Sequence, residues 1–349
     1  MKLTNLEKIL SDQPAFRLQQ AKQAVFVNLI ENWSQATNLP PDLREKLNKE
    51  CPLKIDAEFF VSDDKNTIKA ILSLSDSDKI EAVLMRYALR QAQDKIGRNT
   101  VCVSSQIGCP LGCLFCATGK MRFKRNLETH EIVEQVVLFA RLLKKERQRV
   151  DNVVFMGMGE PFLNYENVMA AIKILNNQKG GMSIGARHIS ISTVGIIEGI
   201  EKFSNEPLQV NLAISLHASN NKLRSRIVPM NKDFPIEKVF KSVEDYLKKT
   251  GRKVMFEYIM IKDLNDSPEQ AKKLVTLIKK IKNGPCMVNL ISYNASLDES
   301  RRATGIFDPS PQGIIKKFKD ILHQAGIEVT QRFRFGQDIQ GACGQLAGK

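Results

Sequence analysis

Two kinds of hydrophobic pattern alternate along most of this chain. From about residue 98 onward, short apolar runs typical of buried strands are separated by longer segments in which apolar residues recur every three or four positions. The strand-like runs are VCVSSQ, VDNVVFMG, HISISTVG, LQVNLAISLH, VMFEYIM and CMVNLISY, and the helical segments include HEIVEQVVLFARLLKKE and IEKVFKSVEDYLKK. These repeated strand-then-helix units predict an α/β fold in which a parallel sheet with right-handed crossovers forms a partial (β/α)6 barrel.

The residues before this core follow other patterns. AKQAVFVNLIENW is amphipathic with a helical period, and LPPDLREKL is typical of a helix that starts at a proline. TIKAILSLSDSDKIEAVLMRY alternates apolar and polar residues on both sides of a Ser/Asp turn, which predicts a β-hairpin. We therefore expect an N-terminal helical accessory module (1–50), a linker with a β-hairpin (51–97), a core domain (98–335) and a C-terminal tail (336–349).

Composition limits the class of protein. With 349 residues, 43% of them hydrophobic, the chain can bury a large core without disulfides. Charges interrupt the longest apolar runs, and the N-terminal MKLTNLEKILSDQ has acidic residues where a signal peptide would be apolar. We therefore expect a cytoplasmic protein with no membrane partner. In that reducing compartment, seven cysteines indicate metal or redox chemistry, since structural disulfides are rare there.

The formal net charge of +14 indicates a polyanionic partner such as RNA or DNA. KKERQR and the lysines between residues 272 and 282 are typical of solvated helix faces. KMRFKRNL (120–127) differs, because its four cations, Lys120, Arg122, Lys124 and Arg125, directly follow a cluster of cysteines. We expect this loop to bind phosphate groups beside the chemistry.

Candidate chemical groups lie where the predicted strands end. Functional residues of such barrels gather at the C-terminal ends of the strands, so we expect these groups to face one cavity. In chain order they are the cysteines between Cys109 and Cys116, the GMGEP segment, Ser192, the segment Ser215–His217, and Asn294.

The cysteines Cys109, Cys113 and Cys116 have the spacing C-x3-C-x2-C. So short a loop can hold a 4Fe–4S cluster while leaving one iron without a protein ligand, and that iron can bind a small chelating molecule. A zinc site with Cys102 as fourth ligand is the alternative, although structural zinc sites usually pair two C-x2-C units. Cys51 and Cys286 are predicted to be small buried residues.

The C-x3-C-x2-C loop resembles the signature of the radical SAM enzymes. CVSSQIGCPLGCLFCATG, GMGEP, ISTVG, SLHA, VNLISYN and DIQGACGQLAG together resemble the RlmN/Cfr group of RNA adenosine methyltransferases, over roughly Lys79 to the C-terminus. The resemblance implies that S-adenosylmethionine (SAM) is the fourth ligand of the cluster. It also implies that SAM is contacted by Gly159, Glu160, Ser192, Ser215, Leu216, His217 and Asn294. Taken singly, such residues are also common in turns and cores.

The resemblance also gives roles to residues outside the cluster. Adenine C2 and C8 are electron-poor, so a polar methyl transfer to them fails and a radical route is required. Two SAM molecules are implied for each turnover: Cys343 takes a methyl group from one, and the 5′-deoxyadenosyl radical from the other removes a hydrogen atom from it. After addition to adenine, Glu81 removes a proton and Cys102 attacks Cys343, forming a disulfide that releases the methylated base. Taken alone, Glu81 is equally typical of a surface residue in a hairpin.

The resemblance implies an enzyme that methylates C2 of an adenosine in 23S rRNA (peptidyl transferase region) and of the adenosine 3′ of the anticodon in tRNA. The target base should be flipped out of its stack, and the N-terminal module should grip RNA away from the site. A flavodoxin- or ferredoxin-like donor would supply electrons to a monomeric enzyme. The alternatives are C8 methylation, another radical SAM enzyme, and a zinc-containing RNA-binding protein without catalysis; Pro161 favours C2.

Overall fold

The computed structural model describes residues 3–87, 97–295 and 307–347. Its strands are β1 (Ala57–Val61), β2 (Thr67–Ser73), β3 (Lys79–Tyr87), β4 (Arg98–Cys102), β5 (Gln106–Ile107), β6 (Arg125–Asn126), β7 (Asn152–Phe155), β8 (Ile189–Thr193), β9 (Asn211–Ser215), β10 (Val254–Met260), β11 (Cys286–Ser292) and β12 (Glu328–Gln331). Its α-helices are α1 (Leu3–Ile9), α2 (Ala15–Phe26), α3 (Pro41–Glu50), α4 (Thr129–Lys145), α5 (Tyr165–Asn176), α6 (Ile197–Phe203), α7 (Asn221–Ile227), α8 (Ile236–Thr250), α9 (Pro268–Ile278) and α11 (Gln312–Gln324).

One large sheet organises the molecule. Its strand order is β1-β2-β3-β4-β7-β8-β9-β10-β11-β12, and every neighbouring pair from β4 to β12 is parallel. The six predicted strands correspond to β4, β7, β8, β9, β10 and β11, so the predicted α/β class and its parallel sheet are confirmed. The sequence pattern missed the short edge strands β1 and β12.

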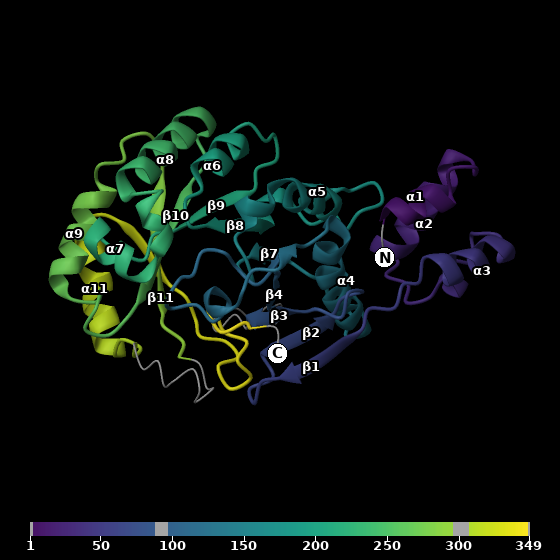
Figure 1. The fold of residues 1–349 in the computed structure, drawn as a ribbon, viewed down its shortest axis with the longest axis horizontal. Coiled ribbons are helices and arrows are strands. Elements are labelled where there is room, and N and C mark those ends of the chain that lie inside the picture. The colour runs from purple at the N-terminus through teal and green to yellow at the C-terminus, as the bar shows by residue number, and fades with distance from the viewer. Residues whose placement is uncertain (1–2, 88–96, 296–306, 348–349) are drawn as a thin grey trace.

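Helices pack along the outer side of this curved sheet. Figure 1 shows α5, α6, α8, α9 and α11 on that side, whereas the C-terminal segment crosses the opposite side. Apolar side chains of the inner strands are buried, as in β8, where Ile189 and Ile191 alternate with partly exposed serines. Helix α8 buries Val239, Phe240 and Val243 along one face against the core. Because the helices cover the outer side, the C-terminal ends of the strands can line a site on the side away from the helices.

The predicted β-hairpin is present and extends the sheet. β2 and β3 pair antiparallel around a turn that joins Ser73 to Lys79. β3 then pairs antiparallel with β4, with Val83 opposite Cys102. The connection between these strands lies mostly outside the described residues. The hairpin therefore lies directly beside the first barrel strand.

The N-terminal residues form helices, as expected, but not over the predicted stretch. The pattern AKQAVFVNLIENW predicted a helix through residue 33, whereas α2 ends at Phe26. Leu29 has a φ of 53°, which a right-handed helix cannot contain, and Asn32 instead accepts a hydrogen bond that starts a short 3-10 turn at Trp33. Trp33 is buried and its indole donates to the carbonyl of Cys51 at 2.7 Å. Trp33 is therefore apolar because it packs in the core, and not because the helix continues to this residue.

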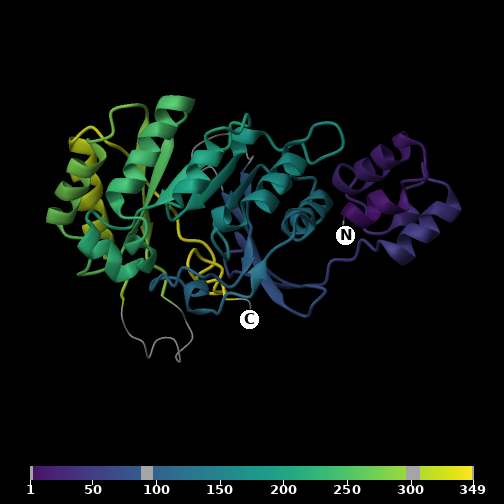
Figure 2. The same ribbon diagram turned by 45° about the horizontal axis from the view of Figure 1, so that its top comes forward.

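The N-terminal helices lie at one end of the molecule, beside α4 and α5 (Figure 2). Arg141 of α4 donates to the carbonyls of Ile30 and Leu53 and so ties this module to the core. Cys51 is buried, as predicted, whereas Cys286 is only half-buried. No helix among the described residues is long and apolar enough to cross a membrane.

Candidate active site

The loop after β4 carries the three closely spaced cysteines. Gly108 begins it with a φ of +71°, and a Cβ at this position would lie 2.3 Å from the carbonyl oxygen of Arg122, so only glycine fits. The backbone then turns back on itself, with the N–H of Cys116 donating to the carbonyl of Cys113 at 3.1 Å. This tight path is what brings three thiols of one short loop to the same side.

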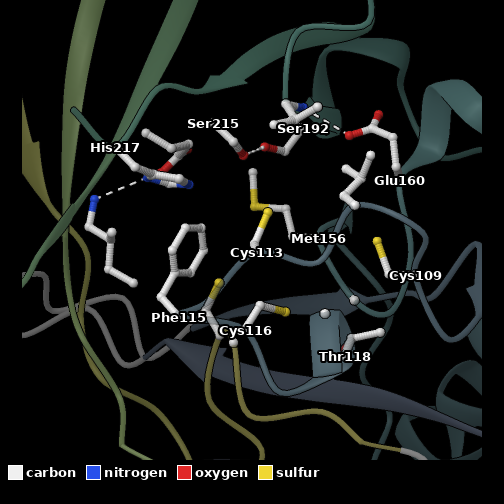
Figure 3. A pocket seen from close by; sticks show the side chains of 18 of the residues that line it. Cys109, Cys113, Phe115, Cys116, Thr118, Met156, Glu160, Ser192, Ser215 and His217 are labelled. Atoms are coloured by element: carbon white, nitrogen blue, oxygen red, sulfur yellow. Dashed lines mark hydrogen bonds between the residues drawn. The ribbon is translucent and has the colours of Figure 1, made fainter. Parts of the chain in front are cut away.

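The three cysteines line a cavity at the C-terminal ends of the strands, which we call the main cavity. It contains about 960 Å³ of space not filled by protein atoms, part of it open to solvent. Figure 3 shows Cys109, Cys113 and Cys116 facing Ser192, Ser215 and His217 across this space. The predicted gathering at one cavity is therefore observed for these six residues, whereas Asn294 does not line this cavity.

The cysteine thiols suit a metal cluster. Burial raises the pKa of Cys109 to about 12 and that of Cys113 well above its usual value, so both thiols stay protonated until a metal replaces the proton. Among the described residues, no three His, Cys, Asp or Glu side chains converge closely enough to ligate one ion. A 4Fe–4S cluster binds each thiolate through a different iron atom, so it does not require such convergence.

Gly159 and Glu160 lie in the loop that follows β7. The φ of Gly159 is +97°, and an added Cβ would meet the side chain of Gln106 at 2.5 Å. Glu160 is buried, and its carboxylate accepts hydrogen bonds from the N–H groups of Val194 (2.8 Å) and Phe162 (3.0 Å). Burial raises the pKa of Glu160 to about 7. The carboxylate thus braces two loops while lining the cavity, where an ammonium group would favour its charged form.

The remaining strand-end residues divide between lining and support. The hydroxyls of Ser192 and Ser215 lie 3.1 Å apart at the cavity wall. Leu216 is fully buried, and its N–H donates to the carbonyl of Glu257 at 3.1 Å. His217 has a φ of 60°, and its Nδ1 accepts from the N–H of Ile259 at 3.2 Å. Burial lowers the pKa of His217 to about 3, so the ring is neutral and carries its proton on Nε2.

A second, smaller cavity adjoins the first, and we call it the side cavity. Cys102 and Asn294 line the side cavity but not the main cavity, whereas Cys343 lines both cavities. The Cys343 thiol is accessible through the cavities although protein surrounds it, and this enclosure raises its pKa. Burial likewise raises the pKa of Cys102 to about 12. Both cysteines are free thiols, and Cys343 is close enough to Cys102 and to Cys116 of the cysteine loop for their charges to interact.

The C-terminal segment that carries Cys343 is held by contacts on both sides. The N–H of Ala117 donates to the carbonyl of Gly344 (2.7 Å), and the Thr118 hydroxyl donates to that of Leu346 (2.6 Å). Asn294 Nδ2 donates to the carbonyl of Cys343 at 3.1 Å. The cysteine loop and the end of β11 therefore fix the position of this thiol.

Glu81 lies on β3 with its side chain buried. Its carboxylate accepts from the N–H of Ala347 at 3.1 Å and lies 3.6 Å from the ammonium of Lys69. It lines neither cavity but contacts the segment that carries Cys343. The surface-residue interpretation of this glutamate is therefore wrong.

Sequence patterns alone missed three residues of the site. Arg332 follows β12, lines both cavities and donates to Met156 Sδ at 3.0 Å. Its charge lowers the pKa of Cys102 and of Cys343 against the effect of burial. Glu257, buried on β10, favours the charged form of Arg332. Met156 directly follows β7, so the strand-end rule contained a signal for it, whereas nothing in the sequence linked Arg332 to the cysteines.

The basic loop after the cysteines is partly neutralised. Arg125 pairs with Glu131 (2.7 Å) and Asp76 (2.7 Å), and Lys124 pairs with Asp78. Arg122 is exposed. The four predicted phosphate-binding cations are therefore not equivalent in the folded chain.

Comparison with known proteins places this geometry among characterised sequences and structures. The Radical SAM superfamily matches residues 103–275. A protein of Dictyoglomus thermophilum named "Probable dual-specificity RNA methyltransferase RlmN" is 45% identical over 96% of this chain and 91% of its own length. A "Ribosomal RNA large subunit methyltransferase N" of Nitrosopumilus maritimus is 42% identical over 98% and 95%. The crystal structure of a radical SAM methyltransferase from Sphaerobacter thermophilus superposes with a TM-score of 0.90, at 39% identity, over 100% and 98% of the two chains.

Proposed function

Since this chain belongs to the RlmN family of radical SAM RNA methyltransferases, we propose that it methylates C2 of an adenosine in 23S rRNA and of the adenosine 3′ of the anticodon in tRNA. Family membership sets aside the non-catalytic zinc protein. One observation carries the proposal: Cys343 lines both the main cavity, beside Cys109 and Cys116, and the side cavity, beside Cys102.

The residues of the main cavity fit the two groups that the family requires. Cys109, Cys113 and Cys116 would hold a 4Fe–4S cluster, and Glu160 with Ser192 would hold SAM. Gly159, Ser215 and His217 line the same cavity and belong to the proposed SAM-binding set. Its other two members are Leu216, which is buried behind the wall, and Asn294, which lines the side cavity and holds the Cys343 carbonyl. When bound, these groups supply a methyl group and the hydrogen abstraction that activates it.

The chain's own residues would then carry the methyl group to the base. The Cys343 sulfur takes the methyl group from a first SAM, and after activation its carbon forms a bond to adenine C2. Glu81, which contacts the Cys343 segment at Ala347, takes the C2 proton. The adduct radical also gives up one electron, which balances the electron consumed when SAM was cleaved, so the RNA linked to Cys343 is closed-shell. The Cys102 thiolate attacks the Cys343 sulfur, an S–S bond forms, and the bond from sulfur to the methylene carbon breaks, with its electron pair staying on carbon, which becomes a methyl group on protonation.

The disulfide formed in this step must be reduced before the next turnover, and two electrons from a flavodoxin- or ferredoxin-like donor would do so. We propose that the enzyme acts as a monomer and that the N-terminal helices (residues 3–50) grip RNA outside the site. The target base would have to be flipped out, since its reacting carbon is inaccessible within a stack.

The position of methylation can be measured directly. RNA from cells that express the wild-type chain in a host lacking such activity should contain 2-methyladenosine, detected by nucleoside mass spectrometry. Protein carrying Cys343→Ala is the matched control and should leave the adenosine unmodified. Formation of 8-methyladenosine would instead support the C8 alternative, and the absence of both products would reject the proposed reaction.

Salt dependence should separate two arginines of the basic loop. Arg122→Gln should lower the log-log salt slope of RNA binding by up to about one unit, because an exposed cation is free to neutralise a phosphate. Arg125→Gln should leave the slope nearly unchanged, because Glu131 and Asp76 already pair with Arg125. The measurement is fluorescence anisotropy of labelled RNA from low to high salt. Equal effects of the two changes would contradict this assignment.

A further inference from the structure

The side cavity is built differently from the main cavity. Its inner wall contains Cys102, Cys343 and Arg332, and its outer part is formed by the residues Phe333 to Phe335 that follow β12. It contains about 580 Å³ of unfilled space, part of which is open to solvent. Both thiols that the proposed reaction uses therefore line this partly open cavity.

Three aromatic rings, those of Tyr87, Phe333 and Phe335, line the side cavity. Tyr87 and Phe335 meet edge to face, with ring centroids 4.5 Å apart, and form one fixed wall. Phe333 lies two residues before Phe335 and lines the same cavity. It is 68% exposed, the largest exposed fraction among the large hydrophobic side chains in the described residues. A ring this exposed beside a cavity offers a face on which a nucleic-acid base can stack.

Cationic groups accompany these rings. Arg334 is exposed, and one of its N–H groups donates to the Ser292 hydroxyl, which leaves the guanidinium further donors. Arg332 lies deeper, against Met156. A flat aromatic surface beside an arginine, with a cavity behind it, is the combination that single-stranded nucleic acids bind, through base stacking and phosphate contacts.

We propose that the side cavity is the binding pocket for the flipped-out adenine, with Phe333 stacking on the base and Arg334 facing its phosphate. This inference rests on the proposed function, since it assigns the entry of the RNA base to that same site. A base that enters here reaches Cys343 from the side of Cys102, whereas SAM occupies the main cavity on the other side of Cys343. The two reactants therefore do not compete for one space.

The test compares binding of two RNAs by the cluster-loaded enzyme without SAM. One is the tRNA anticodon stem-loop with adenosine 3′ of the anticodon, and the other has an abasic site at that position. Phe333→Ala should weaken binding of the adenosine RNA about tenfold, the size of one base–aromatic stack, and should leave binding of the abasic RNA unchanged. Phe333→Tyr should retain the preference for the adenosine RNA.

Phe16→Ala is the control, because Phe16 is 55% exposed on α2 and should not affect the difference between the two RNAs. Iron content and S-methylation of Cys343 establish that each variant is folded and loaded. Equal binding of both RNAs by the wild type, or an equal loss for both RNAs in Phe333→Ala, would overturn the pocket. If the wild type still forms 2-methyladenosine in that case, the proposed function stands and only this inference fails.

Discussion

A Cys102→Ala protein should accumulate covalently joined to RNA through Cys343. The structure places Cys102 on the wall of the side cavity, where Cys343 is also exposed, so Cys102 is the thiol positioned to attack the Cys343 sulfur. Without it, addition to adenine can proceed but release cannot. We expect release of methylated RNA to fall by about a thousandfold or more, as when one member of a group that acts together is removed. Denaturing gels and peptide mapping should show an RNA-linked Cys343 peptide.

Cys343→Ala, at the other cysteine of the reacting pair, should give the opposite result: no covalent adduct with RNA. It removes the methyl acceptor, so the protein should contain no S-methylcysteine and no RNA adduct, while cluster content and SAM cleavage remain. Cys51→Ala is a control at a buried cysteine outside the site and should retain activity. A Cys102→Ala protein that binds its cluster and cleaves SAM, yet carries no RNA-linked Cys343 peptide, would show that the covalent route is wrong for this chain.

Cys113→Ser should lose the iron–sulfur cluster and, with it, all SAM cleavage. Serine is close to cysteine in size but binds iron poorly, and the remaining two thiols of the loop cannot hold the cluster. Anaerobically purified wild type should be brown, and the variant should contain less than about a tenth of the wild-type iron. Iron and sulfide analysis with visible absorption spectra measure this loss independently of any methylation assay.

Cys286→Ser is the matched control, since Cys286 is half-buried on β11 and contributes to neither cavity. It should keep full iron, sulfide and SAM cleavage. If Cys113→Ser kept its full iron content and SAM cleavage, the assignment of the cluster to this loop would be wrong. A colourless wild type containing zinc instead would contradict the assignment for all three cysteines.

The sequence predicted the parts of the site that depend on local order. Ser192 and Ser215 end neighbouring parallel strands, and parallel strands end at the same edge of a sheet, so their proximity follows from the pattern. The C-x3-C-x2-C spacing similarly placed three thiols on one side. The fold class was predictable for the same reason, because each strand-then-helix unit is read from its own residues.

Contacts between distant segments were not predictable in this way. Asn294 follows the expected strand, β11, but it lines the side cavity instead of the main cavity, and its amide donates to the carbonyl of Cys343. Arg332 follows an edge strand too short and polar to give a strand pattern, so its approach to Cys102 had no local signal. Glu81 was predicted through the family resemblance alone, and its contact with Ala347 joins residues 266 positions apart.

The strand order has a consequence for how the protein is made. Each strand from β2 to β12 in the large sheet pairs with the strand of that sheet that precedes it in the chain, so the sheet can grow strand by strand during synthesis. The contact of Thr118 with Leu346 spans 228 positions, and closing so long a loop costs more conformational entropy than pairing neighbouring strands. We therefore expect the C-terminal segment to dock last. Until then, the cysteine loop is not covered by that segment, and iron–sulfur assembly factors would meet it before Cys343 reaches the cavity.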